Sequence, residues 1–402
     1  MTALPTVELL VYPHDCDAFG HLNHAAVLVL LERARWKSLA EGPGMDLFHR
    51  NGVVPVVRKA VVEYRAAAFP TNMLRVESAV VHRGTTSWTI HHTATRVADG
   101  VLIAEADIVF VCLGRVGRPT PLPEEMGRLF GARTMSGQSG RRVTVDGAEL
   151  AVEVRGEGAP VLFVHGFPFD RAMWRHQLAG MSRWKRIAPD LRGMGESSAG
   201  AEEYSMGRYA DDLVAVLDAV GVGQAVVCGL SMGGYIVFEL LRRYPERVRA
   251  AVLCDTRPQA DTPEARRNRD ELAALATERG TDAVGERTVP GLLAPATVAD
   301  QPEVLTQCRD MARRCSVGGV VGALRAMRER PDSTPLLGAI RIPTLIMVGA
   351  EDRVTPPAVA DAMAKAIPGA RYAVIPGAGH VSPLEQPLAT SRALTDFFEA
   401  LS

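Results

Sequence analysis

The sequence predicts two domains of different fold class, joined by a short linker. Residues 1–133 are predicted to be α+β, because one long apolar helix precedes a series of strands rich in Val, Ile and Thr. Residues 143–402 are predicted to be α/β with a mostly parallel sheet and helices on both faces, because short apolar strands alternate with helices. Residues 134–142 are small and polar without periodicity, which predicts a flexible linker.

Composition and charge argue against several classes of partner. The chain has 402 residues, of which 47% are hydrophobic and 23% charged, as in ordinary globular proteins. A net charge of −1 gives no electrostatic reason to expect nucleic acid or an anionic membrane as partner. No apolar run approaches the roughly 18 residues of a membrane span. Scattered histidines and the lack of a phosphate-binding Gly-rich loop predict neither metal nor cofactor.

The termini and cysteines bear on the compartment. Residues 1–8 lack a basic stretch followed by an apolar core, so no secretion signal is visible. The 6 cysteines form no C-x-x-C pair, and several fall in apolar runs typical of buried thiols. A cytoplasmic protein is therefore expected.

The first domain is predicted to contain one long helix over residues 25–41. The helix is apolar on every side in its first half, which predicts burial within a surrounding sheet. A polar turn containing Asp15, Asp17 and His21 leads into it. Strands are predicted at residues 7–12, 53–66, 72–83, 86–97 and 101–113.

These features carry a specific resemblance. The order strand, D-x-D-x-x-G-H-x-N, helix ending E-R-A-R, then four strands resembles the hotdog fold, an antiparallel sheet around a central helix. Within it, residues 7–125 resemble acyl-CoA thioesterases of the 4-hydroxybenzoyl-CoA type. The resemblance implies that Asp17 attacks the thioester or activates water. It also implies that the backbone amide of His24, at the helix N-terminus, polarises the thioester carbonyl.

Other interpretations of this domain remain open. Asp17 is alternatively a turn residue, and Asp15 and Glu63 are rival carboxylates, while Glu32 suits a structural partnership with Arg33 or Arg35. Relatives often carry a second Asn and a nearby aromatic residue where this chain has His24 and Val27, which puts acyl preference and activity in question. The non-catalytic alternative is an oligomerisation scaffold, since hotdog domains pair. A homo-oligomer, dimer or tetramer, is implied in either case.

Residues 225–235 carry the main motif of the second domain. An apolar strand is followed by Gly229-Leu-Ser231-Met-Gly233 and then by a helix. This G-x-S-x-G pattern is a nucleophile elbow, in which a tight turn lifts a serine hydroxyl clear of the sheet. The alternative is a helix start with the Ser231 hydroxyl as N-cap.

Five short motifs follow one another along residues 143–402. They are His165-Gly166, Asp190-x-Arg-Gly-x-Gly-x-Ser197, Gly229-x-Ser231-x-Gly233, Gly349-Ala-Glu-Asp352 and Gly379-His380. In this order they resemble the α/β-hydrolase superfamily, with small esterases and enol-lactone hydrolases nearest. Strands are predicted at 160–165, 186–190, 249–254, 343–348 and 371–375, and a helical lid at about 258–335.

The resemblance implies a Ser-His-Asp triad. Ser231 would be the nucleophile, His380 its base and Asp352 the carboxylate that orients the imidazole, in the chain order of this fold. Glu351 is a rival acid. The oxyanion would be bound by the backbone amides of Met232 and Phe167. His165 is expected to hold its loop rather than act as a second base.

Together these features predict a bifunctional acyl hydrolase that acts on small-molecule esters, lactones or acyl-CoA. The serine centre would act as a carboxylesterase or lactonase, and Asp17 would serve a thioesterase centre. We hypothesise from the fusion alone that the two domains handle related acyl substrates. In the main alternative only the α/β-hydrolase domain is catalytic. A vestigial hydrolase site, or haloperoxidase or C–C hydrolase chemistry, is also open.

Overall fold

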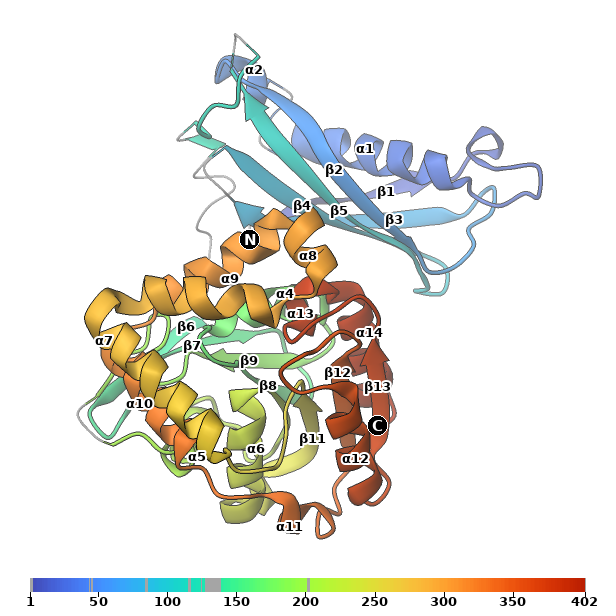
Figure 1. Ribbon diagram of the computed structural model, residues 1–402. Helices are drawn as coiled ribbons and strands as arrows, with labels where there is room; N and C mark the ends of the chain where they lie inside the picture. Colours follow the sequence, from blue (N-terminus) through green and yellow to red (C-terminus); the bar gives the residue numbers. More distant parts are fainter. Residues whose placement is uncertain are drawn as a thin grey trace. The chain divides into compact units, whose positions relative to one another are not determined.

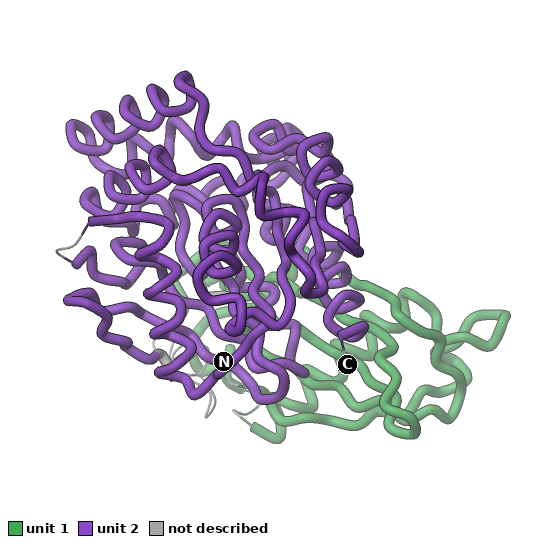
Figure 2. The backbone as a smooth tube through the Cα atoms, turned by 90° about the horizontal axis from the view of Figure 1, so that it is seen from below, with its two compact units in different colours: residues 1–136 green, residues 137–402 purple. Residues whose placement is uncertain are grey.

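The computed structural model describes residues 3–42, 44, 46–83, 86–114, 117–123, 125–126, 139–200 and 203–401. The chain divides into two compact units, unit 1 with residues 1–136 and unit 2 with residues 137–402 (Figure 2). Each unit has its own sheet and its own hydrophobic core. Within these described ranges, no helix has the length and apolar character needed to cross a membrane.

Unit 1 is built on a five-stranded antiparallel sheet in the order β1-β3-β4-β5-β2 (Figure 1). One long helix, α1, lies against it, and this arrangement confirms the predicted antiparallel sheet with a long helix. The elements are β1 (Ala3–Leu10), η1 (Pro13–Asp15), α1 (His24–Glu41), α2 (Leu47–Arg50), β2 (Val54–Tyr64), β3 (Met73–Arg83), β4 (Ser87–Arg96) and β5 (Leu102–Leu113).

Helix α1 is buried along one stripe only. Its Leu30, Leu31 and Ala34 enter the core of unit 1 together with the alternate residues of β4 that face them. Leu28 and Val29 remain 38% and 54% exposed. The prediction of a helix buried on every side is therefore wrong for these two residues, because a helix lying on one sheet covers only its facing stripe.

Unit 2 contains an eight-stranded sheet in the order β13-β12-β11-β10-β8-β9-β7-β6. From β13 to β9 each neighbouring pair is parallel, whereas β6 and β7 form an antiparallel hairpin that joins the sheet at β9, so the predicted mostly parallel sheet is confirmed. The strands are β6 (Ser139–Val145), β7 (Ala148–Arg155), β8 (Pro160–Val164), β9 (Lys185–Pro189), β10 (Ala225–Leu230), β11 (Val248–Cys254), β12 (Thr344–Gly349) and β13 (Arg371–Ile375).

Helices cover both faces of this sheet. Along β10, Ala225 and Val227 belong to one core, shared with α5, α6 and α12, whereas Val226 and Cys228 belong to another, shared with α4 and α14. Successive strand residues thus face opposite layers. The helices are η2 (Arg171–Trp174), α4 (Arg175–Gly180), α5 (Met206–Ala219), α6 (Met232–Arg243), η3 (Pro245–Arg247), α12 (Pro357–Ala366), α13 (Ser382–Glu385) and α14 (Pro387–Glu399).

Helical segments fill the stretch between β11 and β12, where the lid was predicted. They are α7 (Pro263–Leu292), α8 (Pro295–Asp300), α9 (Pro302–Arg314), α10 (Val317–Arg328) and α11 (Thr334–Leu337). Helix α7 is interrupted at Gly280, whose φ of 80° and ψ of 176° are not helical. This interruption divides α7 into two helical stretches within the predicted lid.

The predicted linker needs one correction. Residues 139–142 were assigned to it, but they belong to β6, which starts at Ser139 rather than at Val143. Small and polar residues conceal the strand, whose pairing with β7 supplies the backbone hydrogen bonds that sequence periodicity does not reveal. The remaining part of the predicted linker, residues 134–138, lies outside the described residues.

Candidate active site

The turn at Ser231 has the geometry of a nucleophile elbow. Strand β10 ends at Leu230, α6 begins at Met232, and Ser231 between them has φ 55° and ψ −112°. A positive φ is strained for a residue with a side chain and is tolerated only where the surrounding structure enforces it. A Cβ on Gly233 would lie 2.4 Å from the carbonyl oxygen of Val164, so the turn requires glycine there.

Three predicted residues are connected by hydrogen bonds. Ser231 Oγ lies 2.8 Å from His380 Nε2, and His380 Nδ1 lies 2.8 Å from Asp352 Oδ2. Ser231 occupies the N-cap position of α6, but its side chain makes no capping hydrogen bond, so the N-cap alternative is wrong. His380 and Asp352 are 2% and 3% exposed. The structure thus brings together residues 149 and 28 positions apart in the chain.

Asp352 is held by its own loop. Its Oδ1 accepts hydrogen bonds from the amides of Val354 (2.8 Å) and Thr355 (3.0 Å), and its Oδ2 accepts one from the Thr355 hydroxyl (2.6 Å). The rival Glu351 is exposed. The structure therefore places Asp352, and not Glu351, against His380.

The pKa values of the pair shift in opposite directions. For Asp352, burial disfavours the charged carboxylate, but the adjacent His380 and the hydrogen bonds outweigh it, so the pKa is lowered. For His380, burial disfavours the imidazolium, but the charge of Asp352 and its hydrogen bond outweigh burial, so the pKa is raised. Both shifts favour an ionised aspartate beside an imidazole that can accept a proton.

Asp255, just after β11, is a neighbour that the sequence motifs did not indicate. Its Oδ1 accepts a hydrogen bond from the amide of Gly349, and its Oδ2 lies 2.7 Å from the Ser382 hydroxyl. Those two partners flank the loops that carry Asp352 and His380. Burial, followed by the nearby Asp352, raises the pKa of Asp255 to about 8. Only its position at the end of a parallel strand could have suggested it.

Glu385 is a second residue that the motifs missed. Its Oε1 accepts hydrogen bonds from the amides of Gly379 (2.9 Å) and Val381 (3.1 Å), on either side of His380. Its Oε2 accepts from the amide of Ala294 (2.7 Å) and the hydroxyl of Thr297 (2.8 Å). The same carboxyl group thus ties the His380 loop to the segment around α8.

The lid segment also contacts the His380 loop through the backbone. The amide of His380 donates to the carbonyl of Leu292 at 2.7 Å. A Cβ on Gly379 would lie 2.6 Å from the nitrogen of Ala294, so the two segments pack closely. The end of α7 therefore helps to position the imidazole.

The predicted oxyanion donors lie near the serine. Met232 is the first residue of α6, so its amide has no helical acceptor. Phe167 follows Gly166, where an added Cβ would lie 3.3 Å from the Cβ of Ser231. Among the described residues, neither amide makes a backbone or side-chain hydrogen bond.

His165 has the structural role expected for it. Its Nδ1 donates to the carbonyl of Gly166 (2.9 Å), and its Nε2 accepts from the amide of Leu191 (2.9 Å). Complete burial lowers the pKa of His165 to about 4, so the ring is neutral near pH 7. It ties the loop after β8 to the loop after β9.

The predicted residues of unit 1 lie at the start of α1 and in the turn that precedes it. Asp17 Oδ1 accepts hydrogen bonds from the amides of Phe19 (2.9 Å) and His21 (3.0 Å), so the carboxylate closes its own turn. Within the described part of the chain, Asp17 Oδ2 has no hydrogen-bond partner. Asn23 caps α1 by accepting from the amide of Ala25 at 2.8 Å, and His24 is the first helical residue.

The other carboxylates of unit 1 have structural partners. Buried Asp15 accepts from the amide of Tyr12 at 2.9 Å, and Glu63 forms an ion pair with Arg65. Glu32 Oε1 lies 3.5 Å from Arg35 and accepts from Trp36 Nε1 at 3.3 Å. The expected partnership of Glu32 with an arginine is therefore observed with Arg35. Across the described ranges, no three His, Cys, Asp or Glu side chains are grouped as metal ligands.

Comparison with known families supports the resemblance of both units. Residues 159–387, more than half of the chain, match the family described as alpha/beta hydrolase fold. The chain therefore belongs to the α/β-hydrolase family. Residues 11–130 match the thioesterase-like superfamily, which confirms a thioesterase-like domain in unit 1.

Individual relatives match about two thirds of the chain. A thermophilic esterase from Thermogutta terrifontis is 40% identical, with a TM-score of 0.63 over 65% of this chain and 99% of that one. The enol-lactonase from Burkholderia xenovorans LB400 is 28% identical, with a TM-score of 0.61 over 64% of this chain and 100% of that one. 3-oxoadipate enol-lactonase 2 of Acinetobacter baylyi is 28% identical over 235 residues, which is 58% of this chain and 86% of that protein.

Proposed function

We propose that unit 2 is a serine hydrolase of carboxylic esters or lactones. The observation that carries the proposal is the continuous hydrogen-bond chain from Ser231 Oγ through His380 to Asp352. A serine hydroxyl is a weak nucleophile until an adjacent base accepts its proton, and this arrangement supplies the base and orients it. Relatives that are an esterase and enol-lactonases support the substrate class.

The reaction follows from these positions. As Ser231 Oγ attacks the carbonyl carbon, its proton passes to His380 Nε2, and Asp352 stabilises the imidazolium. The amides of Met232 and Phe167 bind the oxyanion, each contributing about 3 kcal/mol. The C–O bond to the leaving group then breaks, and His380 returns the proton to that oxygen. Water repeats the sequence on the acyl-enzyme and releases the acid.

Covalent labelling and kinetics test this centre. In the full chain, Ser231→Ala should lower hydrolysis of p-nitrophenyl acetate and of simple lactones by a factor on the order of 10⁴ or more. A serine-directed phosphonate should label the wild type and leave Ser231→Ala unlabelled. The exposed Ser182→Ala variant is the matched control. Unlabelled wild type would favour a vestigial site, and halogenation or C–C cleavage without ester hydrolysis would favour the other chemistries.

We propose further that unit 1 hydrolyses acyl-CoA thioesters with Asp17 as nucleophile or base and the His24 amide as carbonyl donor. The match to the thioesterase-like superfamily and the position of His24 as the first residue of α1, where its amide has no helical acceptor, support this role. The bonds of Asp17 to two local amides favour the competing role as a turn residue.

One substitution separates these roles. Asp17→Asn keeps an Oδ1 that can accept from the amides of Phe19 and His21, but it removes the carboxylate. Under the thioesterase proposal, hydrolysis of a panel of acyl-CoA esters by the Ser231→Ala chain should be lost on adding Asp17→Asn. Unchanged thioesterase activity would leave unit 1 as a scaffold.

We also propose that unit 1 pairs with a second copy of the chain. Strand β2 lies at the end of the sheet order and exposes apolar side chains, as a strand that pairs with a second edge would. These include Val54, Val56, Val61 and Tyr64. Light scattering should report a dimer or tetramer, and Val54→Lys with Val61→Lys should dissociate it, whereas Val97→Lys should not. A monomeric wild type would refute the proposal.

The cysteines bear on where this chemistry occurs. All six are free thiols, and five of them are buried, as predicted. Free thiols are typical of reducing compartments. They support the proposal that the protein acts in the cytoplasm, which localisation of a tagged chain would test.

A further inference from the structure

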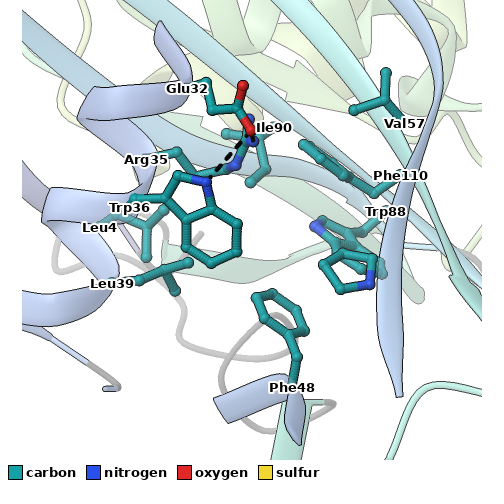
Figure 3. A pocket seen from close by; sticks show the side chains of 11 residues that line it. Leu4, Glu32, Arg35, Trp36, Leu39, Phe48, Val57, Trp88, Ile90 and Phe110 are labelled. Atoms are coloured by element: carbon teal, nitrogen blue, oxygen red, sulfur yellow. Dashed lines mark hydrogen bonds and ion pairs between the residues drawn. The ribbon is translucent and has the colours of Figure 1, made fainter. Parts of the chain in front are cut away.

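A small cavity lies between α1 and the sheet of unit 1, beside the second half of the helix. Its volume is about 90 Å³. Figure 3 shows Arg35, Trp36 and Leu39 of α1 on one side, with Trp88 and Phe110 of the sheet facing them. No sequence motif indicated this cavity, because its lining comes from separate strands and helices.

Stacked aromatic rings give the cavity firm walls. The ring of Trp88 is stacked on Phe48 at 6.0 Å and on Phe110 at 5.3 Å between ring centres. Trp36 meets Phe48 edge-on at 6.3 Å. Such contacts add to the energy of apolar burial, so the cavity is bounded by side chains that do not readily collapse into it.

Two charged side chains, Arg35 and Glu32, line this otherwise mostly apolar space. The side chain of Arg35 is 9% exposed, and its guanidinium carbon lies 4.7 Å from the centre of the Phe110 ring. Among the described residues its polar partner is Glu32, at 3.5 Å. A guanidinium carries five N–H donors, and this one hydrogen bond to Glu32 leaves others that a ligand in the cavity can engage. Burial lowers the pKa of Arg35 more than Glu32 raises it.

Glu32 does not fully pair the charge of Arg35. Its side chain is 56% exposed, and it also accepts a hydrogen bond from Trp36 Nε1 at 3.3 Å. Because Glu32 is more than half exposed and lies at the long end of hydrogen-bond distance, water weakens its attraction to Arg35, so an incoming anion can displace Glu32 at small cost.

We propose that this cavity binds a small monocarboxylate. The carboxylate would pair with Arg35, and a compact apolar body would lie among Trp36, Trp88 and Phe110. An apolar protein cavity of about 150 Å³ holds benzene, so a cavity of about 90 Å³ fits a body of roughly three or four carbons. Arg35 lies eleven residues after His24, roughly 16 Å along the helix, so this site is separate from the Asp17 turn.

Binding to the full-length chain tests the proposal, with isovalerate as the probe and isovaleramide as its neutral counterpart. Tryptophan fluorescence and calorimetry should show saturable binding of isovalerate, and isovaleramide should bind about tenfold more weakly or worse, since a charge-assisted hydrogen bond contributes about 1.5–3 kcal/mol. Arg35→Gln should weaken the binding of isovalerate by the same factor. Arg33→Gln changes an arginine outside the cavity lining and should leave the binding of isovalerate unchanged.

A second variant keeps the test decisive if Arg35→Gln does not fold. Glu32→Gln removes the competing anion at an exposed position, so isovalerate should bind about two- to fivefold more tightly. Acetate should bind more weakly than isovalerate, because it lacks the apolar body. Equal affinity for isovalerate and isovaleramide, no saturable binding, or unchanged or weaker binding to Glu32→Gln would overturn the proposal.

Discussion

The Ser231 site of unit 2 and the Asp17 turn of unit 1 differ in how their side chains are held. Ser231, His380 and Asp352 come from three separate loops and are joined by hydrogen bonds of 2.8 Å. Within the part of unit 1 that the structure describes, the Asp17 carboxylate accepts hydrogen bonds from amides two and four residues away.

The difference shows what tertiary structure adds to a motif. At Ser231 the surrounding fold enforces a strained φ of 55° and delivers a base and an acid to one hydroxyl. At Asp17, each carboxylate hydrogen bond found among the described residues comes from an amide of the same turn. Asp17 is thus held by its own turn, whereas the serine site is assembled from three loops of unit 2.

The largest expected effect comes from breaking the long-range chain at Asp352. Asp352→Asn should lower kcat for ester hydrolysis by a factor on the order of 10⁴, because His380 loses the group that orients it. Loss of the anion also lowers the pKa of His380, since Asp352 raises it. The acidic limb of the profile of kcat/KM against pH should therefore move to lower pH.

Glu351→Gln is the matched control for that experiment. This neighbour is exposed and should leave both kcat and the pH profile unchanged. If the two substitutions had equal effects, the observed bond between Asp352 and His380 would not support catalysis.

A methyl group at the elbow should have the next largest effect. Gly233→Ala places a Cβ 2.4 Å from the carbonyl oxygen of Val164, so the elbow must distort, at a cost of about 3 kcal/mol in the free energy of unfolding. Gly223→Ala, where nothing lies within 4 Å, should cost less than about 1 kcal/mol. Denaturant unfolding of both variants measures the difference, and equal stability would show that the elbow is not tightly packed.

Asp255 gives a pH-dependent test of the loops that carry the triad. Its pKa is raised to about 8, so the folded chain keeps its proton where the unfolded chain loses it, above the ordinary value of 3.8. The unfolded state then binds fewer protons, and this group's contribution to stability falls as pH rises from about 4 to 8. Asp255→Asn should remove that decline, so the stability of the variant relative to wild type should increase toward pH 8.

The same curves would reveal a different state of Asp255. If the unfolding free energies of wild type and Asp255→Asn ran parallel across this pH range, Asp255 would be ionised at neutral pH. The bonds to Gly349 and Ser382 would then be made by a carboxylate.

The smallest effect is expected in the Asp17 turn. Asp17→Ala removes the acceptor for two amides in a half-exposed loop and should lower the free energy of unfolding of unit 1 by about 1 kcal/mol. Asp17→Asn keeps a hydrogen-bond acceptor and should lower the free energy of unfolding by less than Asp17→Ala does. An effect of several kcal/mol would show that the turn is held by more than its local bonds.

The fold classes of both domains and the main residues of the serine site could be predicted from the sequence alone. Strand and helix periodicity predicted both fold classes, and the spacing of Gly229, Ser231 and Gly233 predicted the elbow, because tight turns admit few residue types. The resemblance to α/β-hydrolases implied that His380 and Asp352 meet this serine, with Glu351 as the rival acid. These features are local, or are tied to one recurrent fold.

Tertiary structure alone decided the rest. Asp255 and Glu385 could be identified only from the structure, because their hydrogen bonds join separate loops. A single buried acidic residue has no sequence pattern that distinguishes it. The exposed stripe of α1 and the start of β6 depend on what packs or pairs beside them. The cavity at Arg35 is made by residues of two helices and four strands. Burial and pairing are properties of the neighbours that folding supplies, so no local pattern encodes them.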